Sequence, residues 1–280
     1  PIASPCIVKC SMRPKVPNPE MPRAADSGYR LGYDLLGPAL ALFAKLMLLE
    51  ARSERISRLA FVARDGEMLL RVTKAICQHL PWPAPELEYI YLSRMSTSLP
   101  AEREFGPASI QAAFAIRAGT QNLESLFAYF GLNAEALEPY LASYGLTPAT
   151  IVESPEVLYP MLADQDVRAH IDVERRRQSS LLQRYLVQQR ILDNPDCALV
   201  DIGWRGSIPA ALTQAFPEAW RAVPLRAYYL GYWRETNEIP MPQIRITGIL
   251  SDSRRARNLV EASPRYLTFL LESVCRADHG

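Results

Sequence analysis

The chain contains the stretch Cys197-Ala198-Leu199-Val200-Asp201-Ile202-Gly203-Trp204-Arg205-Gly206-Ser207, in which an apolar run precedes an acid and two glycines. A short apolar run of this kind predicts a buried strand at 197–200, and the apolar spacing that follows predicts a helix from Ile208 to Phe216. A strand that leads through a glycine-containing turn into a helix is the first half of a βαβ unit. The stretch therefore predicts a parallel sheet.

Two earlier stretches have the same organisation. The apolar strand Arg58–Val62 is broken at Arg64-Asp65-Gly66 before a helical apolar period, and a second strand, Leu87–Leu92, ends at Ser93-Arg94. Two strands separated by a helix indicate a βαβ unit, so we expect an α/β protein with a mostly parallel, Rossmann-like sheet. Further strands are predicted at Leu225–Tyr232 and Ile244–Leu250.

The remaining segments predict a linker, one domain and a helical insertion within it. Residues 1–28 carry six prolines and no apolar period, which predicts an extended linker. Residues 29–280 are expected to form one domain, with a helix from Pro38 to about Glu54 and a helical insertion at about 108–190. A last helix is predicted from Leu259 to Val274.

Composition places the chain among globular proteins, since 49% of its 280 residues are hydrophobic, 22% are charged and the net charge is +1. So small a charge excludes a strong global field for nucleic acid. The longest apolar run, Leu35 to Ala44, contains Gly37-Pro38 and falls short of the roughly 20 residues that span a bilayer, so no transmembrane helix is expected. Five cysteines without a Cys-x-x-Cys pair argue against structural zinc and for the reduced cytoplasm.

The predicted strand ends carry the residues best suited to a ligand, because ligands of open α/β sheets bind outside the carboxyl ends of the strands. These ends are 63–66, 92–94 and 201–207, and each contains an arginine that can neutralise an anion. In the third, Gly203 and Gly206 let the backbone wrap a phosphate at a helix N-terminus, and Asp201 can hold ribose hydroxyls. Two structural explanations stay open, namely a turn capped by Ser207 and an ion pair within residues 64–65.

Four strings in the chain are more specific together than any one of them. They are Gly32 through Pro38, Phe61 through Gly66, Tyr91 through Arg94, and Val200 through Ser207. In this order they resemble a phosphoribosyltransferase-like domain of bacterial surface-polysaccharide biosynthesis proteins, which often lies beside a HAD-type hydrolase domain. The resemblance covers roughly residues 29–280. No predicted strand ends in the Asp-x-Asp motif of HAD-type hydrolases, so we expect that activity to lie elsewhere.

The same loops resemble, more distantly, those of type I phosphoribosyltransferases. This resemblance implies that Asp201 contacts the ribose of phosphoribosyl pyrophosphate (PRPP). It implies further roles at the 5-phosphate for Gly203, Trp204, Arg205, Gly206 and Ser207, and at the pyrophosphate for Arg64, Asp65 and Gly66. Ser93 and Arg94 are further candidates for binding the donor. The chain departs from the family pattern at Val200, where a second acid is usual, and at Arg205, where a threonine is usual.

The resemblance to polysaccharide proteins implies an enzyme. It would be a glycosyltransferase that moves ribose 5-phosphate from PRPP to a hydroxyl of a glycan acceptor, in O-antigen (lipopolysaccharide) or capsule biosynthesis. A HAD-type phosphatase would then remove the phosphate and leave ribofuranose. We expect such an enzyme in the cytoplasm, where a peripheral position at the inner membrane is also compatible with the sequence.

The chemistry of this transfer assigns roles to the charged candidates. The leaving pyrophosphate needs cations, which Mg²⁺, Arg64 and Arg94 can supply, and the ribosyl cation needs negative charge from Asp201 or Asp65. A sugar hydroxyl is a poor nucleophile, so a carboxylate base is expected. Asp65 is the first candidate for this base, followed by Glu261 and Glu272.

Two other functions suit the same sequence. A nucleotide-sugar glycosyltransferase could use these strand ends for a diphosphate. A non-catalytic module could instead dock a polysaccharide assembly protein through the apolar helix around Leu35 to Leu49, and it would bind no small phosphate.

Overall fold

The structure is a computed structural model that describes residues 26–116, 121–192, 194–233, 242–254, 271–273 and 275. The chain divides into two units, Pro1–Ala39 and Leu40–Gly280. In the first, α1 (Asp26–Arg30) and the π-helical segment η1 (Leu31–Leu36) lead into α2 (Gly37–Ser53), which confirms the helix predicted from Pro38. Most of the predicted linker, residues 1–25, lies outside the described residues.

One helical stretch is longer than the sequence predicts. The sequence predicts a helix from Pro38, but α1 and η1 precede α2 without a break, and Pro38 lies in the first turn of α2, where a proline is tolerated. The resulting stretch, Gly28–Ser53, is long and apolar enough to cross a membrane by length and composition alone, a test that buried helices of soluble proteins also pass. It is the single such stretch in the described part of the chain.

A five-stranded parallel sheet forms the centre of the second unit. Its strands are β1 (Arg58–Val62), β2 (Glu86–Ile90), β5 (Cys197–Trp204), β6 (Leu225–Tyr232) and β7 (Ile244–Asp252). They lie in the order β2-β1-β5-β6-β7, and each neighbouring pair is parallel. The α/β class and the parallel sheet are thus confirmed. Counted along the chain this is the order 2-1-3-4-5, which is one of the two common orders of doubly wound, Rossmann-like sheets.

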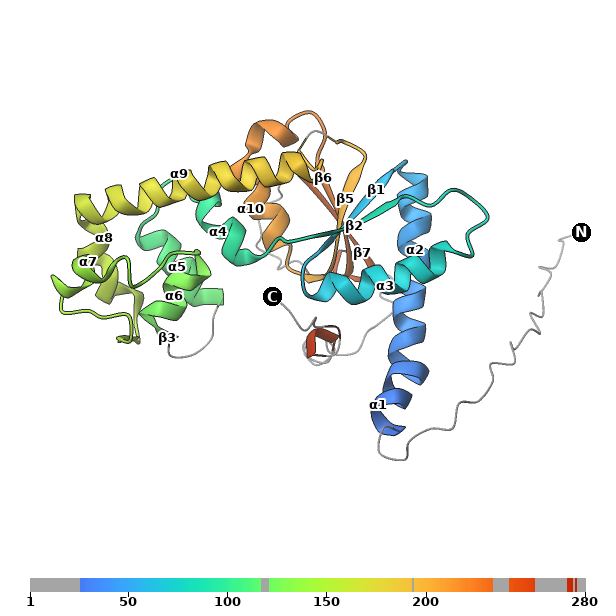
Figure 1. The fold of residues 1–280 in the computed structure, drawn as a ribbon, viewed down its shortest axis with the longest axis horizontal. Helices are drawn as coiled ribbons and strands as arrows, with labels where there is room; N and C mark the ends of the chain where they lie inside the picture. The colour runs from blue at the N-terminus through green and yellow to red at the C-terminus, as the bar shows by residue number, and fades with distance from the viewer. Residues whose placement is uncertain are drawn as a thin grey trace, which may run out of the picture. The chain divides into compact units, whose positions relative to one another are not determined.

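Helices cover both faces of the sheet (Figure 1). On one face α3 (Asp65–Cys77) packs on β1, β2 and β5, with Gly66 against Phe61. On the other face α10 (Ser207–Ala215) and the end of α9 (Gln165–Gln188) share a core with the sheet. This core includes Val62, Ile90, Leu182, Leu186, Leu199, Ile208, Leu212 and Tyr229. Because side chains alternate along a strand, Phe61 and Val62 serve opposite faces.

A helical region separates β2 from β5. It begins with α4 (Arg94–Ala101), before the predicted residue 108, and ends with α9. Between them lie α5 (Pro107–Ile116), α6 (Leu123–Tyr129), α7 (Glu138–Ala142), η2 (Pro155–Leu158) and α8 (Tyr159–Ala163), with the short antiparallel pair β3 (Gln121–Asn122) and β4 (Ile151–Val152). The region has its own core, and α4 joins it to the sheet by packing against α10 and α9.

Strand β5 continues beyond the predicted turn at Asp201. Its last residues pair with β6, with Gly203 opposite Gly231 and Trp204 opposite Tyr232. The two strands approach so closely that a Cβ atom on Gly203 would lie 2.1 Å from the Gly231 carbonyl oxygen, and Gly203 has φ +132°. Glycine at 203 is therefore required by the sheet itself.

Replacing Gly203 by alanine is expected to lower the free energy of unfolding by about 2 kcal/mol or more, because it adds both a clash and an unfavourable φ. Urea denaturation measures the change. Gly106→Ala is the matched control, since a Cβ there meets nothing within 4 Å and is expected to change stability little. Equal stability of the two variants would show that β5 does not pack on β6 in this way.

Candidate active site

The candidate site lies where the strand order reverses, between β1 and β5. From β1 the chain crosses through α3 to β2, and from β5 it crosses through α10 to β6 in the opposite direction. The loops that leave the carboxyl ends of these two strands consequently diverge, and the position between them, which we call the crevice, is where doubly wound folds bind ligands. The predicted site residues at 64–66 and 205–207 follow these two strands.

Three carboxylates and an arginine meet at this crevice. Asp65 is the first residue of α3, and Asp201 lies in β5 just beyond Val200, which pairs with Phe61 of β1. Glu272 belongs to a helical segment at 271–273 and accepts a hydrogen bond from Nε1 of Trp204 at 3.1 Å. The charges of Asp65, Glu272 and Arg64 all act on Asp201. The structure therefore brings together Arg64, Asp65, Asp201 and Glu272.

Asp201 has an unusual protonation equilibrium. Burial raises the pKa of its carboxyl to about 8, and the negative charges of Asp65 and Glu272 contribute to the rise. The N–H group of Ile202, which donates to Oδ1 of Asp201 at 2.8 Å, and the Arg64 guanidinium lower the pKa, but not enough to compensate. At neutral pH the group thus holds its proton for most of the time. A carboxyl group whose pKa lies near the working pH is typical of functional sites.

Arg64 occupies a strained position at the edge of the crevice. It has φ +72°, although it is not a glycine, and it precedes the first residue of α3. Its backbone N–H donates to the Tyr89 hydroxyl at 2.8 Å, which ties the loop after β1 to β2. A left-handed non-glycine residue costs on the order of 1–3 kcal/mol, and such strain concentrates at functional sites. The exposed guanidinium is free to turn toward an anion.

The turn after β5 is shorter than predicted. Gly203 and Trp204 belong to the strand, so only Arg205, Gly206 and Ser207 can contact a phosphate. Gly206, with φ +77°, is the N-cap of α10, and Ser207 is the first helical residue and exposed, so Ser207 is not the predicted cap. Gly206 has no side chain to accept from the first N–H groups of α10. These N–H groups can therefore serve an anion.

Trp204 has a packing role in place of the predicted contact with the donor. Its buried ring stacks on Trp233 with the ring centroids 4.4 Å apart, and its N–H is taken by Glu272. Tyr232 is buried as well, beneath the guanidinium of Arg254. The aromatic side chain that the structure exposes at the end of β2 is Tyr91, which is 65% exposed. Its position two residues before Ser93 was the sequence signal for this residue.

Ser93 and Arg94 follow β2, the neighbour of β1 on the side away from β5. Ser93 is the N-cap of α4, where its hydroxyl accepts from the N–H of Ser96 at 3.2 Å in a capping box, so its hydroxyl has a structural partner. Helix α4 packs against α10, the helix that follows β5. Arg94 is exposed and long enough to reach inward. Glu261, the other predicted base, lies outside the described residues.

One carboxylate at the crevice suits a metal ion that is held mainly by a substrate. Within the described ranges, no three His, Cys, Asp or Glu side chains are grouped to hold a metal ion on their own. Mg²⁺, however, is typically bound by one or two carboxylates together with substrate phosphates. Asp65 fits this donor set, whereas Asp201, which holds its proton at neutral pH, does not.

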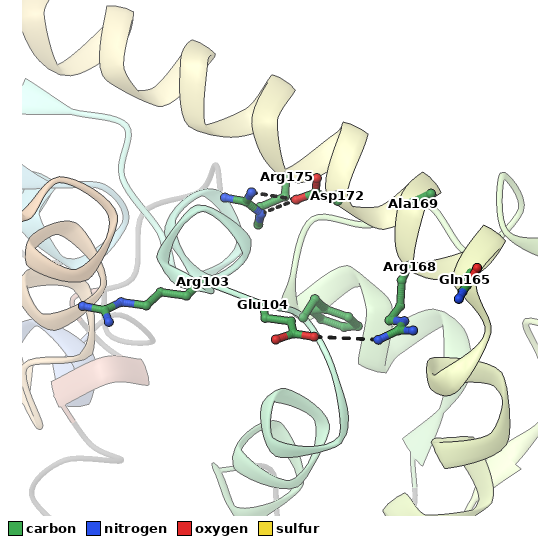
Figure 2. A pocket seen from close by; sticks show the side chains of 8 residues that line it. Arg103, Glu104, Gln165, Arg168, Ala169, Asp172 and Arg175 are labelled. Atoms are coloured by element: carbon green, nitrogen blue, oxygen red, sulfur yellow. Dashed lines mark hydrogen bonds and ion pairs between the residues drawn. The ribbon is translucent and has the colours of Figure 1, made fainter.

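Two cavities of about 380 and 410 Å³ lie in the helical region and not at the strand ends. Figure 2 shows the first, between the turn at 103–105 and α9. Two of its three arginines are paired with acids, Arg168 3.8 Å from Glu104 and Arg175 2.6 Å from Asp172. The strand ends remain the better candidate for binding an anion, because they add the N-terminus of α10 to an arginine.

No protein-family model and no curated protein matches the chain. The fold and the crevice therefore define its class, an α/β protein with a parallel, doubly wound sheet and an acidic site at its switch point.

Asp201→Asn is expected to stabilise the protein at high pH. Since the pKa is raised from 3.8 to about 8, the contribution of Asp201 to stability is fully present below pH 4 and is lost as the pH rises to 8. Asparagine cannot ionise. The free energy of unfolding of the variant should therefore exceed that of the parent by roughly 2–5 kcal/mol at pH 8 and by little at pH 4. Urea denaturation at both pH values measures this.

Asp196→Asn is the matched control, because Asp196 is exposed at the other end of the same strand. Its effect on the free energy of unfolding should be small, because the side chain is exposed. A stability gain of Asp201→Asn that does not depend on pH would contradict the assignment of a raised pKa to Asp201.

Proposed function

We propose that the chain is a PRPP-dependent phosphoribosyltransferase-like enzyme. It would transfer ribose 5-phosphate to a hydroxyl of a glycan in bacterial O-antigen or capsule biosynthesis, before a HAD-type phosphatase removes the phosphate. The observation that carries the proposal is the meeting of Arg64, Asp65 and Asp201 at the switch point, beside the N-terminus of α10. Cationic groups for a diphosphate and anionic groups for a sugar cation are thus supplied at one crevice.

The reaction requires charge of both signs. The hydroxyl oxygen of the acceptor forms a bond to C1 of the ribose, the bond between C1 and the pyrophosphate oxygen breaks, and pyrophosphate leaves with the electron pair. Asp65 stabilises the positive charge that develops on the ribose, Arg64 stabilises the pyrophosphate, and the N–H groups of α10 hold the 5-phosphate. Mg²⁺, held by the substrate phosphates with Asp65, would supply further positive charge at the pyrophosphate.

Asp201 is a better candidate for the general base than Asp65, the first candidate from the sequence. A general base works best when its pKa lies near the working pH, and the raised pKa of Asp201, about 8, meets this condition. We therefore assign to Asp201 the proton that leaves the acceptor hydroxyl. Asp65, the first candidate from the sequence, then acts through its charge, both on the ribose and on the pKa of Asp201.

PRPP with Mg²⁺ is expected to raise the melting temperature more than pyrophosphate or UDP-glucose does. A ligand at about 100 times its dissociation constant adds about 2.7 kcal/mol of stability. Arg64→Ala should weaken the shift, while Arg71→Ala, an exposed arginine of α3 that pairs with Glu67, should not. Stabilisation by UDP-glucose alone would favour a nucleotide-sugar glycosyltransferase, and no shift with any of the three would contradict both enzymes.

The rate of transfer should rise with pH up to about 8, because Asp201 must be ionised to accept the proton. Glu272→Gln removes a negative charge that raises this pKa while keeping an oxygen to accept from Trp204, so the rise should move to lower pH. The pH dependence of kcat/KM measures both. An unchanged profile would exclude Asp201 as the base, and complete loss of activity would give that role to Glu272.

A further inference from the structure

Helix α2 is apolar on two opposite faces. One face is buried and includes Phe43, Ala44, Met47 and Leu48. The other carries Leu42 and Leu49, which are 46% and 41% exposed, with the partly buried Leu46 between them. Of the most apolar 18-residue window in Gly28–Ser53, only 33% is buried. Contiguous apolar surface of this kind is a mark of an interaction site.

The exposed face belongs to a helix that is firmly held. Glu54, directly after α2, accepts a hydrogen bond from the Tyr228 hydroxyl at 2.8 Å and forms an ion pair with Arg245 at 2.5 Å. The guanidinium of Arg52 lies over the Trp82 ring, 4.5 Å from its centroid. The exposed leucines are thus presented on a rigid surface, which lowers the entropic cost of binding a partner.

The spacing of the exposed residues is that of a helix pair. Leu42, Leu46 and Leu49 follow at intervals of four and three residues, and Ser53 continues the series. These intervals place them at the a and d positions of a heptad, the seam at which two helices meet. Ala44, Met47 and Leu48 then fall on the opposite side, which is the side that the structure buries. The seam and the domain core therefore do not compete for the same side chains.

Charges beside the seam favour a second copy in parallel orientation. Lys45 and Glu50 flank the seam on opposite sides and are five residues apart. In a parallel pair of helices, a residue at the first of these positions faces the second position of the other helix. Lys45 then lies opposite Glu50 of the partner subunit, and the twofold axis forms this contact twice.

We propose that this chain forms a parallel, twofold symmetric dimer through the Leu42–Leu46–Leu49 seam of α2. The seam buries the exposed leucines of both copies, and the Lys45–Glu50 contacts select a second copy of this chain and set its direction. The proposal is independent of the enzymatic function, because the seam and the crevice share no residue.

Light scattering after gel filtration tests the seam on the full 280-residue chain. The parent should have twice the mass of one chain, and Leu42→Glu with Leu49→Glu should be monomeric. Val173→Glu with Val187→Glu is the matched control, since these valines of α9 are 59% and 49% exposed, and it should remain dimeric. A monomeric parent, or dimers in all variants, would overturn the proposal.

Charge reversal tests the partner and gives a result even where the leucine variant fails to fold. Lys45→Glu should raise the dissociation constant of the dimer about tenfold, and adding Glu50→Lys should restore it. Failure of the double variant to restore the dimer would overturn the parallel arrangement. Leu42→Cys should likewise form a disulfide with its own copy upon oxidation, because equivalent seam positions face each other only in a parallel pair.

The exposed apolar face of α2 could bind a membrane surface in place of a second copy. Flotation with vesicles of anionic phospholipid distinguishes these two interpretations. Flotation of a monomeric parent with the vesicles, lost in Leu42→Glu with Leu49→Glu, would assign the apolar face to a lipid surface and reject the dimer. A dimeric parent that does not float supports the seam.

Discussion

The parallel pairing of β5 with β1 on one side and β6 on the other is the constraint from which the rest of the second unit follows. It reverses the strand order at one point, so that α3 and α10 lie on opposite faces and their N-termini open onto a common crevice. It also sets Asp201 beside the end of β1, close enough for the charge of Asp65 to raise its pKa. The acidic site is thus a consequence of the sheet topology.

The same pairing explains why local strain gathers around the crevice. Gly203 and Gly231 bring β5 and β6 into close approach, Gly206 takes a left-handed conformation at the start of α10, and Arg64 has a positive φ before α3. The glycines suit their positions, whereas Arg64 departs from what its residue type prefers and is held by the hydrogen bond to Tyr89 of β2. Proteins keep such departures mainly where function requires them.

Sequence patterns predicted the strands that are buried on both faces. They failed to predict strand ends that depend on pairing with a neighbouring strand. Strand β1 is apolar and wholly buried, so its bounds could be predicted, whereas Asp201 and Gly203 are poor strand formers that β6 holds in the sheet. The spacing of Ser93 and Ser96 indicates a cap, and this signal was missed in favour of a ligand contact. The approach of Glu272 to Trp204, 68 residues apart, depends on the path of the chain and leaves no local pattern.

Charged side chains are arranged differently at the amino ends of the strands and at the switch point. At the amino ends of the strands, acids meet bases: Arg58 is buried and pairs with Glu86 at 2.5 Å, and Glu54 pairs with Arg245. Asp252, at the carboxyl end of β7, also has its arginine, Arg254, at 2.7 Å. At the switch point, by contrast, the charges of Asp65 and Glu272 raise the pKa of Asp201 more than the charge of Arg64 lowers it. Folding alone favours the first arrangement, because like charges destabilise the compact state, and the second arrangement is typical of a functional site.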